Sequence, residues 1–402
     1  RDLRMSRGLG DVYKRQEYEE VILMNFTLAG PVCPLGPMFA AMDARAELDF
    51  WGLTRHYAMQ SRRFGGAVPE HLQSHFLALR PRLFNSDAFW DYWQQMALPA
   101  SYEQSVILHE TRFTPYFAAK GYIWDTYVNT DDLCGVFVNP IMACPAELLQ
   151  KRDCPFFKRR SLFTPYADEL RRTDGCAARE LYRYVKAHTE FPVDLLLASL
   201  LQTQPMAALA KNLHWNYVIA EPAAEVPDLA ALGLRLLRYT LPAADPVTDW
   251  YNKKASADAD ALLGRAAQLF EKKPLLGVLS PMLPLWQGCA AARRTQWQRD
   301  ARTLAEKAAV PVGSDPLPAP NCGWLLVREA SFLDGIPPCT TQRDAWQLAL
   351  TAQAAGYYAA AFETAAQAAA RADVLDVYEA DAARPAAVAK HLGRLIKHKL
   401  QK

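Results

Sequence analysis

Long apolar runs, a strong charge of one sign and paired cysteines are all missing from this sequence of 402 residues. No apolar stretch approaches the ~20 residues that a helix needs to cross a bilayer, so no spanning helix is expected. The net charge of +2 gives no field that would attract nucleic acid, and no nucleic-acid partner is expected. The eight cysteines are scattered without a CxxC pair, which indicates free thiols in a reducing compartment rather than a zinc site.

The common catalytic signatures are also absent. The sequence has no Walker motif, GxGxxG, GxSxG or HExxH. Nucleoside-triphosphatase, dinucleotide-binding, serine-hydrolase and zinc-protease functions are therefore not indicated. No signal peptide is recognisable, and a cytoplasmic location is expected.

Residues 1–16, RDLRMSRGLGDVYKRQ, do not match the rest of the chain. They carry four arginines and a lysine with no apolar centre, and they resemble a translated sequencing adapter. We expect this segment to be a non-native artefact and the natural chain to extend upstream of Glu17, so that the present chain is a truncated copy.

The remaining sequence alternates short apolar runs with helical patterns, which is typical of α/β layers. At 51% hydrophobic and 22% charged residues it is long enough for two or three domains of ~150 residues. We expect an α/β domain over residues 17–218 that ends in a helical segment. A Pro-containing linker at 219–228 and a smaller, helix-rich α/β domain at 229–402 follow. The expected strands of the first domain are Val21–Met24, Leu48–Thr54, His71–Leu79 and Tyr122–Tyr127.

A helix expected at Tyr102–Lys120 carries a carboxylate among apolar side chains. Val106, Phe113 and Phe117 share one face, and Glu110 lies on that same face. An acid in an apolar stripe is costly unless it is paired or used, and burial raises a carboxyl pKa as a general base requires. Glu110 is therefore either a general base or the partner of a neighbouring arginine or backbone group.

The strand expected at Leu48–Thr54 offers a second set of candidates. Gly52 removes a side chain where another backbone or a ligand must come close. Trp51 presents an aromatic face of the kind on which sugars stack, although core packing would explain it equally well. Trp51 and Thr54 are our candidates for ligand binding from this strand.

The segment PEHLQSHF places polar residues along the strand expected at His71–Leu79. On one strand, alternate residues share a face, so the row would line either a polar ligand site or a solvated sheet face. The candidates for binding a polar ligand are Glu70, His71, Gln73 and His75.

Two basic segments are candidates for contact with anions. Lys158, Arg159 and Arg160 lie between aromatic residues and are phosphate-binding candidates, with a solvated loop as the alternative. The basic amphipathic end at 390–402 suits either an anionic lipid surface or a plain surface helix.

Several blocks, taken in order, resemble a known family. EVILMNFTLAGPVCPLGPMFAAM, ELDFWGLTRH, VPEHLQSHFLAL, HETRFTPYFAAKGY and CPFFKRRSLF are similar to the rhamnan synthesis protein F family of bacterial cell-wall polysaccharide glycosyltransferases. The resemblance implies a GT-A-like open sheet that binds a nucleotide-sugar at the carboxyl ends of its strands. It also implies that the donor-binding half, which lies before this region in the family, is incomplete in this chain.

The resemblance further implies how the site is arranged. After the first strand, relatives carry an Asp-containing motif near the donor diphosphate and its metal, where this chain has Asn25-Phe26-Thr27. The donor-binding candidates are then Asn25, Thr27, Trp51 and Thr54. The candidates for acceptor or sugar binding are Glu70, His71, Gln73 and His75. A Mg²⁺ or Mn²⁺ cofactor is left open because Phe26 cannot ligate a hard cation. Glu110 matches the acceptor-side base of inverting enzymes.

The function implied is transfer of rhamnose or a similar hexose from a nucleotide-sugar to a growing surface polysaccharide. The acceptor would be a polysaccharide or a lipid-linked glycan, with the enzyme at the inner membrane face. The truncated chain is expected to be weak or inactive. A non-catalytic carbohydrate-binding or scaffold subunit is the alternative, which Phe26 motivates.

Overall fold

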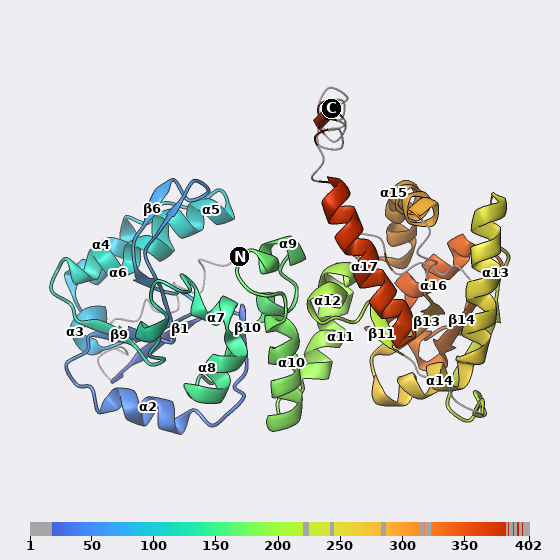
Figure 1. Ribbon diagram of the computed structural model, residues 1–402. Helices are drawn as coiled ribbons and strands as arrows, with labels where there is room; N and C mark the ends of the chain where they lie inside the picture. Colours follow the sequence, from blue (N-terminus) through green and yellow to red (C-terminus); the bar gives the residue numbers. More distant parts are fainter. Residues whose placement is uncertain are drawn as a thin grey trace. The chain divides into compact units, whose positions relative to one another are not determined.

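The computed structural model describes residues 18–219, 225–241, 245–282, 287–313, 317, 323–382, 385, 389, 392–393 and 396. The chain divides into two compact units, Arg1–Val193 and Asp194–Lys402 (Figure 1). Both combine strands and helices, so the expected α/β class is confirmed. The adapter-like segment 1–16, residues 220–224 of the expected linker and most of the basic end at 390–402 lie outside the described residues.

Unit 1 is built on a four-stranded sheet with the strand order β1-β8-β3-β9. β8 is antiparallel to both β1 and β3, whereas β3 and β9 are parallel. Three shorter ladders, β10-β2, β4-β7 and β5-β6, surround this sheet. The strands are β1 (Val21–Met24), β2 (Leu28–Ala29), β3 (Phe50–Gly52), β4 (Arg55–His56), β5 (Met59–Ser61), β6 (Gly66–Val68), β7 (His71–Leu72), β8 (Phe76–Leu79), β9 (Trp124–Thr126) and β10 (Phe157–Lys158).

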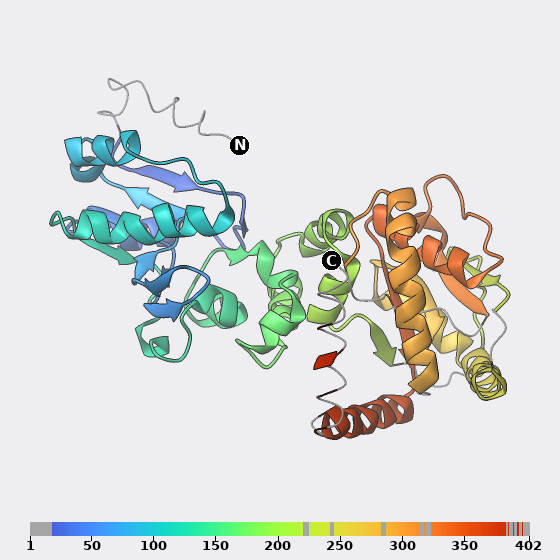
Figure 2. The same cartoon turned by 90° about the horizontal axis from the view of Figure 1, so that it is seen from above.

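Helices cover this sheet with an aromatic core. Phe50 of β3 packs edge-on against Phe113 and Phe117 of α6, and all three rings are buried. Burial of each such side chain contributes roughly 1.5–3 kcal/mol. In the view of Figure 2 α6 lies across the strands. The helices of unit 1 are α2 (Gly36–Asp43), α3 (Pro81–Phe84), α4 (Asp87–Gln94), α5 (Tyr102–Ser105), η2 (Val106–Glu110), α6 (Thr111–Ala118), η3 (Asp131–Leu133), α7 (Pro140–Ala143), α8 (Pro145–Lys151), η4 (Arg159–Leu162), α9 (Tyr166–Leu170) and α10 (Ala177–His188).

The helix expected at Tyr102–Lys120 is present as α5, η2 and α6 in succession. The Ser101 side chain accepts a hydrogen bond from the backbone amide of Gln104 at its start. The middle segment η2 is one π-helical turn, which the periodicity of the sequence does not reveal. π turns inside α-helices are frequent at functional sites, and this one ends at Glu110.

The prediction of one strand over His71–Leu79 is wrong. The chain pairs at β7, turns at 73–75 and pairs again at β8. Two backbone hydrogen bonds hold the turn. The N–H of Gln73 donates to the Thr54 carbonyl (3.1 Å), and the N–H of Phe76 donates to the Gln73 carbonyl (3.5 Å). His71, Gln73 and His75 therefore do not share one strand face, and all three are buried rather than solvated.

Gly30 allows the β2–β10 ladder to form. Its φ is +140°, and a Cβ on it would lie 2.6 Å from the Phe156 ring and 2.7 Å from the Pro155 carbonyl oxygen. The amide of Val32 donates to that same carbonyl at 2.9 Å. The close approach brings Lys158 of β10 opposite Leu28 of β2.

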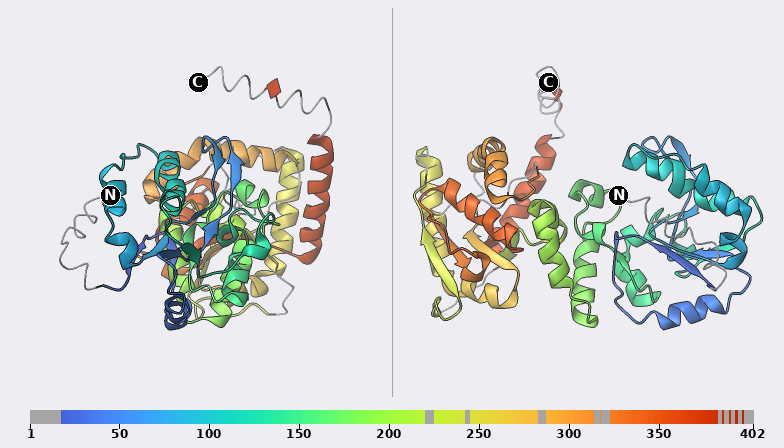
Figure 3. Two further views of the ribbon diagram at one scale, coloured as in Figure 1. Left: turned by 90° about the vertical axis from the view of Figure 1, so that its left-hand side faces the viewer. Right: turned by 180° about the vertical axis from the view of Figure 1, so that it is seen from behind.

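Unit 2 contains a five-stranded mixed sheet with the strand order β11-β15-β13-β14-β12. Its central strands β13 and β15 are buried along their whole length. The long helix α17, drawn in red, follows β15 (Figure 3). The elements are α11 (Val193–Thr203), α12 (Met206–Asn212), β11 (Tyr217–Ile219), β12 (Leu234–Arg238), α13 (Pro246–Ala261), α14 (Leu263–Lys272), β13 (Leu276–Pro281), α15 (Gln287–Ala308), β14 (Trp324–Arg328), η5 (Glu329–Ser331), α16 (Gln342–Ala354), β15 (Tyr358–Glu363) and α17 (Ala365–Ala382).

The two units divide after Val193, ahead of the boundary that the sequence indicates at 219–228. The reason is that α11 and α12 pack on unit 2. The side-chain amide of Gln353 donates to the carbonyl oxygens of Leu201 (2.9 Å) and Gln204 (3.1 Å). Trp215 also stacks on Tyr358 with ring centroids 4.4 Å apart.

Candidate functional site

One edge of the unit 1 sheet gathers most of the polar candidates. β1, β3 and β9 run in the same direction, so their carboxyl ends lie at one edge together with the start of β8. The segments at this edge carry Asn25 directly after β1, Thr54 two residues after β3, Asn129 three residues after β9 and His75 directly before β8. The carboxyl edge is where open α/β sheets bind ligands.

The Asn25-Phe26-Thr27 corner is a rigid turn. The Asn25 side-chain oxygen accepts from the Thr27 amide (3.0 Å) and from the Thr27 hydroxyl (2.6 Å). The backbone N–H of Asn25 donates to the His75 carbonyl (3.2 Å), and the backbone N–H of Arg159 donates to the Thr27 carbonyl (2.9 Å). The backbone is therefore fixed on both sides of Phe26.

The β2–β10 ladder brings two of the three basic candidates to this corner. Arg159 contacts the Phe26 carbonyl through Nη1 at 3.5 Å, and its Nε is buried without a hydrogen-bond partner. The pKa of Lys158 is lowered by burial, while Glu110 acts in the opposite direction and Arg160 adds to the lowering. Arg160 itself is exposed, and no contact of its side chain with the corner is found among the described residues.

Glu110 faces the same region from the helical side. Its Oε1 accepts a hydrogen bond from the Ser74 amide at 3.3 Å, in the turn between β7 and β8. The carboxylate also interacts electrostatically with Lys158 and with His56 and His71. Glu110 is thus partnered by a backbone group, and it lies near cationic and titratable groups rather than in an arginine ion pair.

A buried polar row lies behind the corner. The Thr54 hydroxyl donates to the Gln73 side-chain oxygen (2.8 Å) and lies 3.4 Å from His75 Nε2. Because its single hydrogen goes to Gln73, Thr54 accepts from His75, which places the proton of His75 on Nε2. His75 Nδ1 then remains a buried acceptor without a partner. Burial, with a smaller effect of Lys158, lowers the pKa of His75 well below its usual value.

His56 is a site residue that the sequence does not reveal. It is the cross-strand partner of His71 in the β4–β7 ladder, and the two rings stack with centroids 5.2 Å apart. His56 Nδ1 lies 2.8 Å from the backbone carbonyl oxygen of Tyr57, and His71 Nδ1 lies 2.7 Å from that of Pro69. In the neutral rings Nδ1 therefore carries the proton, and Nε2 keeps its lone pair. Burial lowers the pKa of both histidines.

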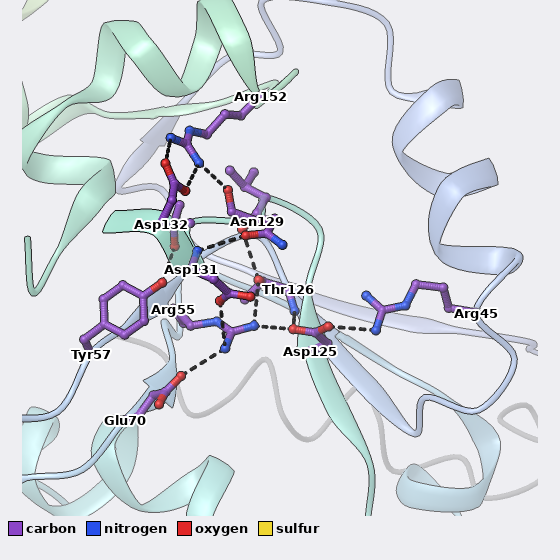
Figure 4. A network of polar contacts seen from close by, with 12 residues as sticks. Arg45, Arg55, Tyr57, Glu70, Asp125, Thr126, Asn129, Asp131, Asp132 and Arg152 are labelled. Carbon is purple, nitrogen blue, oxygen red and sulfur yellow. Dashed lines mark hydrogen bonds and ion pairs between the residues drawn. The ribbon is translucent and has the colours of Figure 1, made fainter. Parts of the chain in front are cut away.

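Arg55 is the second group that sequence analysis misses. It lies between three carboxylates, with Nη1 3.0 Å from Glu70 and 3.6 Å from Asp131, and with Nη2 bonded to Asp125 (Figure 4). Asp125 also pairs with Arg45 at 2.7 Å. The Arg55 side chain is only 16% exposed. This Arg55 network joins the segments after β3 and β9. It also holds Glu70, which was predicted to bind the acceptor, in an ion pair.

A second arginine, Arg152, holds the segment after β9. Arg152 of the segment after α8 bonds both carboxylate oxygens of Asp132 (2.7 and 2.8 Å) and one of Glu147 (3.0 Å). It also donates to the Asn129 carbonyl at 2.8 Å, as Figure 4 shows. These bonds fix the chain after β9 against the helical layer.

Burial rules out direct ligand contact for several candidates. Trp51 is fully buried, tilts against Phe76 at 5.4 Å and donates to Glu20 at 2.7 Å, so its ring is part of the core. Thr54 is equally buried and bonded to its neighbours. What approaches Gly52 is the Leu72 side chain, which a Cβ would meet at 3.0 Å, rather than a ligand. The sequence left both a ligand site and core packing open for Trp51, because a local pattern does not show what covers a residue.

The corner does not fit a divalent cation. Both lone pairs of the Asn25 amide oxygen are engaged by Thr27, and no carboxylate replaces the Phe26 ring. Hard cations prefer several oxygens, usually with carboxylates among them. Within the described segments, no group of three or more His, Cys, Asp or Glu side chains is arranged to hold a metal ion.

Comparison with protein families gives one match. The model of rhamnan synthesis protein F matches residues 10–230, which is more than half of the chain. The chain belongs to the rhamnan synthesis protein F family. Neither a curated protein nor a solved structure matches it.

Membership in the rhamnan synthesis protein F family confirms the resemblance seen in the sequence. It assigns the chain a glycosyltransferase-related role in the synthesis of a cell-wall polysaccharide. The match ends near the start of β12, so it covers the whole sheet edge described above. None of the helices in the described segments is long and apolar enough to cross a membrane.

Proposed function

We propose that this chain transfers rhamnose or a similar hexose from a nucleotide-sugar to a growing cell-surface polysaccharide. The reaction is an inverting single displacement. The observation that carries the proposal is the convergence at one sheet edge of the Asn25-Phe26-Thr27 corner, the Lys158–Arg159 pair and Glu110. Family membership supports the reaction class.

Glu110 acts as the general base in this proposal. It takes the proton from the acceptor hydroxyl while the oxygen attacks the anomeric carbon, and the nucleoside diphosphate leaves. The Ser74 amide fixes the carboxylate at 3.3 Å, which supports an oriented base. No arginine ion pair of Glu110 is found in the described part of the chain, so the carboxylate remains available.

The departing diphosphate is stabilised by cationic side chains. Lys158 pairs with Leu28 in the ladder, and the amide of Arg159 donates to the Thr27 carbonyl, so both residues lie beside the end of the corner. Positive groups held where negative charge develops lower the barrier without reorganisation of the site. The buried row of Thr54, Gln73 and His75 positions this edge from behind.

The acceptor in this proposal is a polysaccharide or a lipid-linked glycan, with the protein at the inner face of the membrane. The basic segment at 390–402 suits contact with anionic headgroups there, and only a few of its residues are described. Vesicle co-sedimentation with and without anionic lipid measures that contact directly.

The test compares nucleotide release by the wild type and by Glu110→Gln in the full chain. We expect the variant to lose about 10²- to 10⁴-fold in kcat while binding nucleotide normally. Glu103→Gln is the matched control, because Glu103 belongs to the same helical segment and pairs with exposed Arg63 at 2.8 Å. Full activity of Glu110→Gln would remove Glu110 from the mechanism. Glycan binding without any nucleotide release would favour a scaffold subunit.

A further inference from the structure

Phe26 is the most exposed Phe, Tyr or Trp side chain among the described residues, at 82%. A single exposed apolar residue is common on protein surfaces and needs no explanation by itself. Phe26 is distinguished by its position, at the carboxyl end of β1 on the edge that carries the candidate site.

The ring is presented by a fixed backbone. Four hydrogen bonds hold the two residues that flank Phe26: two from Thr27 to the Asn25 side chain, one from Asn25 to His75, and one from Arg159 to Thr27. A contact surface held in place before binding loses little conformational entropy when a ligand arrives. The corner therefore suits a contact that must be made at a defined place.

A cation with unfilled donors lies next to the backbone carbonyl of Phe26. Arg159 Nη1 reaches the Phe26 carbonyl only at 3.5 Å, and the buried Nε has no partner. Nη1 makes only this long contact and the residue is half-buried, so the guanidinium can offer its terminal nitrogens to the oxygens of an anion. Phosphate matches the fork geometry of arginine.

The donor atoms of the corner argue against a metal bridge to that anion. Phe26 supplies no oxygen, and the side-chain oxygen of Asn25 is engaged by Thr27. A phosphate bound here is therefore met by Arg159 directly, and Lys158 on the same ladder adds a second positive charge.

We propose that Phe26 and Arg159 bind the sugar 1-phosphate part of the donor without a divalent cation. Arg159 holds the phosphate, and the Phe26 ring covers the apolar C–H face of the attached sugar. This inference rests on the proposed function, because it assigns the donor to this edge. A 6-deoxyhexose carries a methyl group where other hexoses carry a hydroxymethyl group, so the exposed ring favours 6-deoxy sugars.

Calorimetric titration of the full chain in EDTA with rhamnose 1-phosphate, glucose 1-phosphate and inorganic phosphate tests this site. The wild type is expected to bind rhamnose 1-phosphate most tightly. Phe26→Ala should weaken that binding about 5- to 10-fold, the value of one aromatic contact, and leave inorganic phosphate unchanged. Tyr102→Ala removes another exposed ring, 55% exposed, and should change neither affinity.

Arginine variants test the phosphate half of the site. Arg159→Met should weaken all three probes, whereas the exposed neighbour Arg160→Met should not. Arg159→Lys keeps the charge without the fork and is expected to give an intermediate loss, which also serves if Arg159→Met fails to fold. Equal effects of the Arg159 and Arg160 variants would overturn the assignment.

Phe26→Asp gives the sharpest outcome. The new carboxylate repels phosphate, so binding in EDTA should be lost, and Mn²⁺ should restore it by joining the two anions. Full affinity of Phe26→Asp in EDTA, unchanged affinity of Phe26→Ala, or a wild type that binds only with Mn²⁺ would each refute the proposal. These titrations measure binding without turnover. Their outcome therefore does not depend on whether Glu110→Gln abolishes activity, and the two proposals can fail separately.

Discussion

The amide of Asn25 donates a hydrogen bond to the carbonyl of His75 at 3.2 Å. This bond joins the corner after β1 to the turn between β7 and β8, and the amide of the preceding residue of that turn, Ser74, donates to Glu110. The predicted base and the predicted donor corner are thus connected through two adjacent residues. Changes in this turn are therefore expected to alter the positions of both Glu110 and the Asn25-Phe26-Thr27 corner.

Thr54→Val should destabilise unit 1 while keeping its shape. The valine leaves Gln73 without its donor and His75 Nε2 without its acceptor, in a position that is fully buried. We expect a loss of about 1–3 kcal/mol in the free energy of unfolding, measured in urea. Thr54→Ser keeps the hydroxyl and serves as the control, with a smaller loss from the missing methyl group. A neutral Thr54→Val would show that the polar row does not stabilise this edge.

Stability should fall as the pH is lowered through about 6.5, the ordinary pKa of histidine. Burial lowers the pKa values of His56, His71 and His75, so the folded state binds fewer protons than the unfolded state below that pH. Their contribution is complete above about pH 6.5 and is lost as the pH falls toward the folded pKa values. Each histidine that stays neutral contributes a slope of up to about 1.4 kcal/mol per pH unit.

The slope of the stability curve below pH 6.5 is measured by urea unfolding at several pH values. His75→Gln should flatten it most, because His75 is completely buried. His188→Gln, at the exposed end of α10, is the control. An unchanged slope in His75→Gln would mean that the ring is protonated in the folded protein.

Arg55→Met should cost far more stability than the loss of a surface ion pair. It leaves the carboxylates of Glu70, Asp125 and Asp131 facing one another without their shared cation. We expect a loss of about 3 kcal/mol, as for a mostly buried pair that loses one partner. Arg63→Met removes a pair in which both side chains are exposed, and should cost no more than about 1 kcal/mol. Similar losses in the two variants would make the Arg55 network a surface feature.

Gly30→Ala should disturb the β2–β10 ladder and with it the placement of Lys158 and Arg159. The added Cβ would meet the Phe156 ring at 2.6 Å, on a backbone with φ of +140°. A loss of about 1–3 kcal/mol is expected in thermal or urea unfolding. Gly36→Ala, where a Cβ would meet nothing within 4 Å, should be close to neutral.

The position of the boundary between the units predicts which fragment folds. A fragment of residues 194–402 retains the bonds from Gln353 to Leu201 and Gln204 and the stack of Trp215 on Tyr358. A fragment of residues 229–402 loses all of them and exposes the surface that α11 and α12 cover. We expect only the longer fragment to show a cooperative thermal transition, which circular dichroism measures. Equal cooperativity of both would place the boundary at the linker expected from the sequence.

Local features of the fold could be predicted because neighbouring residues decide them. The apolar run at Val21–Met24 forms β1, and Ser101 caps the helix that follows it at Tyr102. Gly121, with a positive φ, ends that helical region. Glu110 of this segment is half-buried, and the π turn that contains it does not follow from the spacing.

Features that depend on distant segments were decided by the tertiary structure. Trp51 suited both a ligand site and the core, and the packing of Phe76 against it settled the question. His56 and His71 meet only because two-residue strands pair, which is too short a pattern to be read from the sequence. Arg55 reaches Asp125 across 70 residues, and charge type alone does not select partners over that separation. The sequence determined which elements form and the family to which the chain belongs, whereas the approach of distant segments decided which side chains are buried and which meet at the sheet edge.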